Sequence, residues 1–179
     1  MDESVLLTSK HVQDVNDLLA EEDPEYDWCI EGVREQGERC ILTGNEGKGK
    51  STLLRQIAIQ VAMGIHPFTL EECEPKKVWL LDLENPRALV KREINKILAG
   101  REIEKGWLVT SLWPQGIDIS HDQWKLLMVE LLKMIKPSLL VIGPMYKLFP
   151  GGTETEQLAS QLAFEIDRWR VEFKCSVLL

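Results

Sequence analysis

A glycine-rich octapeptide at residues 44–51, GNEGKGKS, constrains the fold of this chain more than any other feature. It fits the pattern G-x-x-x-x-G-K-[ST], and it lies between an apolar segment at residues 40–43 and an apolar-periodic segment at residues 51–63. The first segment predicts a strand and the second predicts a helix that Gly64 ends. The octapeptide therefore favours an α/β domain with a tight loop at the carboxyl end of a strand.

The residue types of this loop suit a polyphosphate. Glycines let successive backbone N–H groups face an anion, and the following helix directs its N-terminal dipole toward the same charge. We expect Lys50 to reach the β- and γ-phosphates of ATP and the Ser51 hydroxyl to help coordinate Mg²⁺. The predicted nucleotide-binding residues here are Gly44, Asn45, Glu46, Gly47, Lys48, Gly49, Lys50, Ser51 and Thr52. The alternative is a glycine-rich turn at a strand end.

Strand-like and helix-like segments alternate along the rest of the chain. Strands are predicted at residues 78–83, 107–112, 139–142 and 175–179, and helices at residues 86–99, 121–135 and 156–173. This alternation implies right-handed crossovers and a mostly parallel sheet with helices on both faces. We expect an N-terminal part at residues 1–27, made of a short helix capped by Ser9 and an acidic linker, and an α/β core at residues 28–179.

Composition and charge limit the classes of function. No apolar run approaches the ~20 residues of a membrane span, and the N-terminus lacks the features of a signal peptide, so we expect a cytoplasmic protein without a membrane partner. The net charge of −8 gives no attraction of the whole chain to nucleic acid, so any DNA contact must be local. The four scattered cysteines predict buried free thiols, and they do not form a zinc-site pattern.

Two carboxylates lie at the end of the predicted strand at residues 78–83. Asp82 and Glu84 emerge at the sheet edge where the glycine-rich loop is expected. Glu84 could orient and deprotonate a water near a γ-phosphate, as hydrolysis requires. Alternatively, one of the two carboxylates caps the helix that begins near Pro86.

With these motifs in this order, the chain from about Trp28 onward resembles the RecA-like P-loop ATPases, and most closely their RepA-type branch. That branch contains hexameric replicative helicase ATPases of plasmids and phages, related to the DnaB-like helicases. The resemblance implies Mg-dependent ATP hydrolysis with Glu84 as the catalytic glutamate, and it places Lys91 or Arg92 against adenine. A surface charge on an amphipathic helix is the alternative for Arg92. Single-stranded DNA and a homo-hexameric ring, with an arginine from the neighbouring subunit, are also implied.

The chain departs from the family pattern in two places. Gly143 stands where an aspartate normally ends the Walker B strand, which predicts weaker hydrolysis unless Asp82 helps to hold the Mg²⁺. The last core strand, with its γ-phosphate sensor and DNA-binding loop, is expected beyond Leu179, so we expect the C-terminal part of the motor to be missing. The loop at residues 150–156 is acidic and gives no evidence for DNA contact.

Two other functions fit the same loop. One is an ATP-binding switch or assembly factor with poor turnover, which the glycine at position 143 favours. The other is a P-loop kinase of small molecules, for which the chain lacks a clear arginine-rich lid. The tryptophans of the predicted strands and helices are expected in the core rather than in a base-stacking platform.

Overall fold

The computed structural model describes residues 12–23, 25–149 and 156–179. Its centre is a five-stranded sheet in which every pair of neighbouring strands is parallel. The strand order is β3-β7-β6-β4-β5. The strands are β3 (Arg39–Cys40), β4 (Val78–Asp82), β5 (Leu108–Leu112), β6 (Leu139–Gly143) and β7 (Ser176–Leu178).

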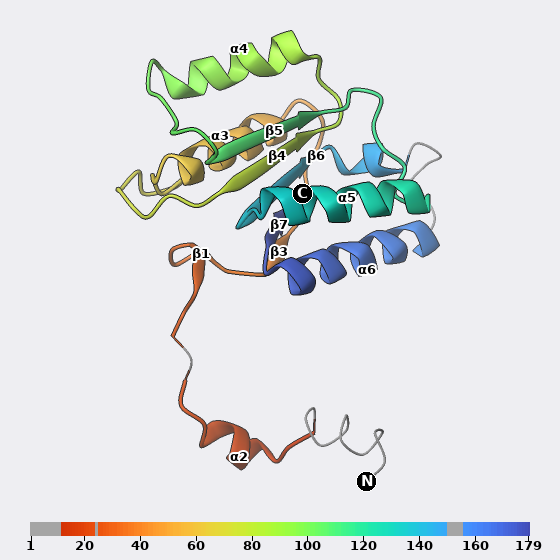
Figure 1. Cartoon of the computed structure of the whole chain (residues 1–179). Coiled ribbons are helices and arrows are strands. Elements are labelled where there is room, and N and C mark those ends of the chain that lie inside the picture. Colours follow the sequence, from red (N-terminus) through yellow and green to blue (C-terminus); the bar gives the residue numbers. More distant parts are fainter. Residues whose placement is uncertain (1–11, 24, 150–155) are drawn as a thin grey trace.

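Helices cover both faces of this sheet (Figure 1). One face carries α3 (Lys50–Ala62) and α4 (Arg87–Leu98), and the other carries α5 (Asp122–Ile135) and α6 (Glu156–Phe173). A short 3₁₀ helix, η1 (Met145–Leu148), follows β6. This three-layer arrangement confirms the predicted α/β fold with a mostly parallel sheet.

The core explains why the central strands read as continuous apolar runs. All residues of β4 are buried, as are the first four of β6, because helices pack on both faces of these strands. Trp79 on β4 and Trp169 on α6 are fully buried, as expected for core tryptophans. Cys29 and Cys175 are buried free thiols, but Cys40 and Cys73 are partly exposed, so the prediction of buried thiols was right for only two of the four.

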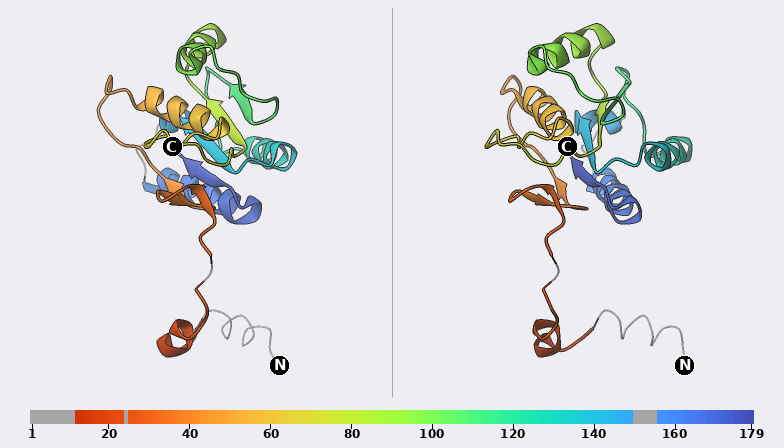
Figure 2. Two further views of the ribbon diagram at one scale, coloured as in Figure 1. Left: turned by 90° about the vertical axis from the view of Figure 1, so that its left-hand side faces the viewer. Right: turned by 60° about the vertical axis from the view of Figure 1, so that its left-hand side comes forward.

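The N-terminal part differs from the prediction in detail. Helix α2 (Val15–Leu19) has no buried residue and stands away from the α/β body, as Figure 2 shows. Its N-cap is Asp14, whose carboxylate accepts a hydrogen bond from the amide of Asn16 at 2.8 Å, whereas Ser9 lies outside the described residues. The core begins with an antiparallel hairpin of β1 (Trp28–Ile30) and β2 (Arg34–Glu35), where no strand was predicted from the sequence.

Several element boundaries differ from the prediction by a few residues. Helix α5 begins at Asp122 with His121 as its N-cap, one residue later than predicted. The preceding Ser120 does not cap the helix, because both its amide and its hydroxyl donate to the carboxylate of Asp118. Strand β3 is shorter than expected and ends at Cys40, although the Leu42 amide still donates to the Leu179 carbonyl at 2.7 Å. Of the acidic loop at residues 150–156 that was considered for DNA contact, residues 150–155 lie outside the described part, and Glu156 begins α6. In that described part, no helix has both the length and the apolar character needed to cross a bilayer.

Candidate functional site

The glycine-rich loop connects β3 to α3 at the carboxyl edge of the sheet. Helix α3 begins at Lys50, and its N-cap is Gly49 with φ of 83°, while Gly47 within the loop has φ of 72°. A Cβ atom at either glycine would meet nothing within 4 Å, so the left-handed backbone, and not lack of space, is what requires glycine here. The sequence thus encodes the curled backbone that was predicted for an anion site.

The N-terminus of α3 is open for an anion. No side chain caps it, so its first amides keep their hydrogen-bonding capacity. The Lys50 ammonium folds over the loop and donates to the carbonyl oxygens of Gly44 at 2.5 Å and Asn45 at 2.8 Å. Ser51 and Thr52 are exposed in the first turn of the helix. An open helix N-terminus, a curled loop and an adjacent lysine fit a polyphosphate with its Mg²⁺.

Glu84 lies just beyond the carboxyl end of β4, at the same edge of the sheet as the loop. Its carboxylate accepts a hydrogen bond of 2.6 Å from the Tyr146 hydroxyl, which η1 supplies from the neighbouring strand connection. This bond to Glu84 is the main cause that raises the pKa of Tyr146 to about 12, and the charges of Glu84 and Glu46 add to it. The bond thus joins η1, which follows β6, to the turn that follows β4.

Asp82 is buried at the end of β4, and its carboxylate is fully engaged. One oxygen, Oδ2, lies 2.7 Å from Nη2 of Arg55 on α3. The other, Oδ1, accepts hydrogen bonds from the amides of Glu84 at 3.1 Å and Asn85 at 2.8 Å. These contacts indicate that Asp82 holds the turn that carries Glu84. They do not indicate the metal-binding role that was predicted for Asp82.

Gly143 ends β6 directly opposite Asp82 in the parallel ladder. A small cavity of about 20 Å³ lies where α3, β4 and β6 meet, and its lining includes Ser51, Arg55, Asp82 and Gly143. A Cβ atom at Gly143 would lie 3.4 Å from Leu54 Cδ1, an ordinary van der Waals separation. The position expected to carry a carboxylate thus lies at the site, is occupied by glycine, and has room for a small side chain.

Comparison with known proteins agrees with this geometry. The sequence profile of the AAA domain matches residues 3–179. The chain belongs to the AAA domain family. Among solved structures, this AAA domain is similar to a KaiC-like protein from the hyperthermophilic archaeon Pyrococcus horikoshii OT3, with 18% sequence identity and a TM-score of 0.59. No curated protein sequence matches it.

The structural match covers 87% of the AAA domain and 66% of the archaeal chain, so the domain spans just under two thirds of that protein. At this level of identity the match shows the fold alone. Family and fold together make the chain a RecA-like P-loop ATPase domain. The finer likeness to RepA-type helicases stays a prediction.

Arg92 is exposed on α4, and in the described part of the AAA domain it makes no hydrogen bond or ion pair. Its neighbour Lys91 is exposed as well. The structure therefore leaves both side chains free to contact a base, and equally free to remain in solvent. The adenine contact predicted for either residue stays a prediction.

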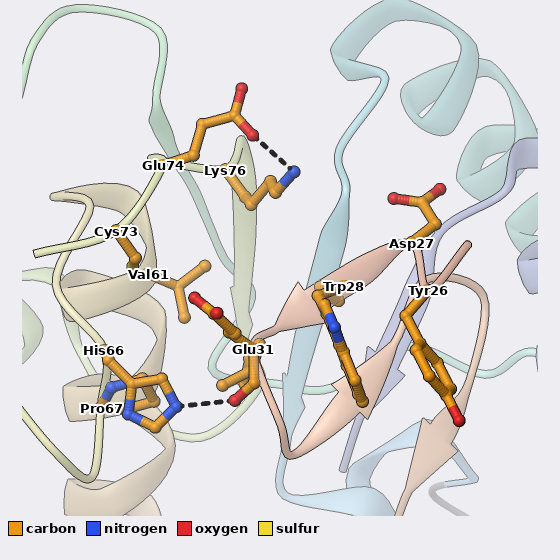
Figure 3. A pocket seen from close by; sticks show the side chains of 12 residues that line it. Tyr26, Asp27, Trp28, Glu31, Val61, His66, Pro67, Cys73, Glu74 and Lys76 are labelled. Carbon is orange, nitrogen blue, oxygen red and sulfur yellow. Dashed lines mark hydrogen bonds and ion pairs between the residues drawn. The ribbon is translucent and has the colours of Figure 1, made fainter.

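A second hollow, of about 310 Å³, lies near the other end of α3 (Figure 3). It is lined by Val61 near the C-terminus of α3, by the β1 segment and by His66, whose ring contacts the Glu31 carbonyl at 3.0 Å. Because Val61 is 11 residues beyond Lys50, at ~1.5 Å per residue the hollow is about 16 Å along the helix from the loop. It is thus separate from the candidate nucleotide site.

Sequence reasoning missed two residues of this site, Arg55 and Tyr146. Arg55 appears in the sequence as one polar residue within a helix, and the only signal was its place on the apolar side next to Leu54. Tyr146 follows the predicted Walker B strand, but the sequence does not show that η1 turns it toward Glu84. Both contacts join segments that are distant in the sequence.

Proposed function

We propose that this AAA domain binds Mg-ATP at residues 44–52 and hydrolyses it with Glu84 as the base that activates water. The observation that supports this best is the position of Glu84, just beyond the carboxyl end of β4 at the same edge of the sheet as the loop, where its carboxylate accepts a hydrogen bond from the Tyr146 hydroxyl. A carboxylate at this edge is suited to orient a water for in-line attack.

The other residues divide the work of binding. Lys50, which bonds to loop carbonyls in this structure, would exchange these for phosphate oxygens, and the exposed Ser51 hydroxyl would join the Mg²⁺ coordination. Bound Mg²⁺ neutralises charge that develops on the phosphates. Asp82 is close enough to Ser51 to line the same cavity, so we expect it to influence the metal through Ser51 or a water.

The decisive experiment measures phosphate release from Mg-ATP by the purified chain. Glu84→Gln should lower kcat by roughly 10²- to 10⁴-fold with little change in nucleotide affinity, since general-base catalysis contributes about this much. Glu102→Gln is the matched control, because Glu102 is an exposed glutamate on the loop before β5. Equal turnover in the wild type and in Glu84→Gln would contradict the proposed role of Glu84.

We further propose that the ATPase is the motor of a RepA-type DNA helicase or a related replication ATPase that acts as a hexamer in the cytoplasm. The resemblance in motif order and the RecA-like fold support this proposal. The net charge of −8 places any DNA contact on a restricted surface or on another part of the protein. Single-stranded DNA should stimulate ATP hydrolysis by the protein and shift its sedimentation to that of a ring. Absence of both effects would exclude this role.

A second candidate is an ATP-binding switch or assembly factor with slow turnover. Gly143 supports it, because the carboxylate expected at the end of β6 is missing and the nearest substitute, Asp82, is engaged by Arg55. In that case Gly143→Asp should increase phosphate release. Rapid hydrolysis by the wild type would exclude the switch.

A further inference from the structure

The buried ion pair of Arg55 and Asp82 joins two parts of the candidate site. Nη2 of Arg55 lies 2.7 Å from Oδ2 of Asp82, and the two side chains are only 8% and 5% exposed. Arg55 lies on α3, little more than one turn after Lys50 and Ser51, whereas Asp82 ends β4. The pair therefore links the helix of the P-loop to the strand that leads to Glu84.

The same carboxylate shapes the turn in which Glu84 lies. Its Oδ1 atom accepts hydrogen bonds from the backbone amides of Glu84 and Asn85, and the Asn85 side-chain amide donates to both carboxylate oxygens at 3.1 and 3.2 Å. Because Arg55 holds Oδ2, the carboxylate cannot rotate without breaking these bonds. The backbone position of Glu84 thus depends on Arg55.

Stability alone does not account for this arrangement. A buried ion pair recovers its desolvation cost only when its geometry and its other hydrogen bonds are good, and an apolar pair of similar volume often stabilises a fold as well. In the described part of the chain, Nε of Arg55 is buried without a hydrogen-bond partner, which lowers the net gain further. What the pair does supply is one fixed arrangement of α3 relative to the Glu84 turn.

We propose that Arg55 is a positioning residue for ATP hydrolysis, which acts through Asp82 to hold the Glu84 turn against the helix of the P-loop. The inference rests on the proposed function, in which Glu84 is the base. Loss of the pair leaves the loop able to bind nucleotide but lets the carboxylate of Glu84 drift from the γ-phosphate. The defect is therefore in kcat, with KM preserved.

The test uses the full chain and a double variant, Arg55→Met with Asp82→Asn. Arg55→Met alone would leave a buried unpaired carboxylate and endanger folding. The added Asp82→Asn change removes that charge and keeps an oxygen that can accept from the amides of Glu84 and Asn85. Arg55→Lys is the conservative variant, because a single guanidinium nitrogen reaches Asp82. Glu130→Gln with Lys133→Met removes an exposed ion pair on α5, on the opposite face, as the control.

We expect the double variant to fold, to bind ATP with affinity and KM within about twofold of the wild type, and to lose roughly 10- to 100-fold in kcat. Hydrogen exchange at the Glu84 and Asn85 amides should become about tenfold faster in the nucleotide complex, since their acceptor is no longer held. Arg55→Lys should recover most of the turnover, and the α5 control should match the wild type.

Glu84→Gln, measured in parallel, separates this inference from the proposed function. If Glu84→Gln loses turnover but the double variant keeps the wild-type kcat, the positioning role of Arg55 is wrong and the role of Glu84 stands. If Glu84→Gln keeps its turnover, the proposed function fails. The role of Arg55 in hydrolysis fails with it, and the exchange measurement then reports only whether Arg55 holds the turn. Where Glu84→Gln does lose turnover, unchanged protection of the two amides in the double variant overturns the inference.

Discussion

Replacement of Gly143 by aspartate should destabilise the nucleotide-free domain in a way that Mg-ATP reverses. Gly143 and Asp82 are direct partners in the parallel ladder, so a new carboxylate on β6 would project from the same face as that of Asp82. Neighbouring strands lie ~4.8 Å apart, which sets a carboxylate separation of about 5 Å. The site would then hold two acidic groups beside one guanidinium.

The size of the effect follows from this distance. Two like charges about 5 Å apart repel by roughly 3 kcal/mol at an effective dielectric constant of about 20. Arg55, already 2.7 Å from Asp82, offsets part of this repulsion, so we expect the free energy of unfolding to fall by about 1–3 kcal/mol. For a chain of 179 residues this corresponds to a Tm lower by about 2–12 °C.

The assay is thermal unfolding of three variants with and without Mg-ATP. Gly143→Ala tests the added Cβ alone and should be neutral or more stable by up to ~1 kcal/mol, because its nearest neighbour, Leu54 Cδ1, is 3.4 Å away. Gly143→Asn tests size and polarity without charge. The difference in Tm between the Asp and Asn variants reports the repulsion between the two carboxylates. Mg-ATP should reduce this difference in Tm or reverse its sign. Equal Tm values for these two variants under both conditions would refute the reasoning.

Three further predictions concern single residues. Lys50→Ala should weaken Mg-ATP binding at least about tenfold in calorimetric titration, since a charge-assisted contact contributes about 1.5–3 kcal/mol, and unchanged affinity would exclude Lys50 from phosphate binding. In a variant whose other tyrosine is Phe, tyrosinate absorbance should report a pKa of about 12 for Tyr146, falling toward 10 in Glu84→Gln. The stability that this raised pKa contributes is complete below pH 10 and is lost as pH rises through 12, and a midpoint unaffected by Glu84→Gln would disprove the hydrogen bond. Thiol reagents should modify Cys73 well before Cys175, whose burial raises its pKa to about 12, and equal rates measured by peptide mapping would contradict the packing of β7.

Local patterns in the sequence predicted most of the fold. The helix after the P-loop, β4 and β6 were found because a helix period or a continuous apolar run is a property of neighbouring residues. The β1–β2 hairpin was missed because Arg34 and Glu35 give no strand pattern, and pairing with Trp28 and Ile30 defines the strand. The start of α5 differs by one residue from the prediction, since Ser120 bonds to Asp118 and does not cap the helix.

Part of the candidate site could also be predicted from local sequence, and part of it could not. The curled backbone of the loop could be predicted, since the glycines that require it are close together in sequence. The places of Tyr146 and Arg55 in the site could not be predicted, because each depends on a hydrogen bond to a partner on another element. The partner is Glu84 for Tyr146 and Asp82 for Arg55. The departure at Gly143 was visible in the sequence, but its alignment opposite Asp82 required the register of the sheet.

The place of β3 at the edge of the sheet has a consequence for the order of folding. Among the described residues, the strand that delivers the P-loop pairs with β7 alone. Residues that meet across this junction, such as Gly37 and Ser176, are 139 positions apart in the chain. During synthesis from the N-terminus, the loop is made early, but among the described strands its own strand has no partner until β7 is complete. Closing so long a loop is entropically costly and typically slow. The nascent chain should therefore acquire nucleotide binding only after β7 has been made.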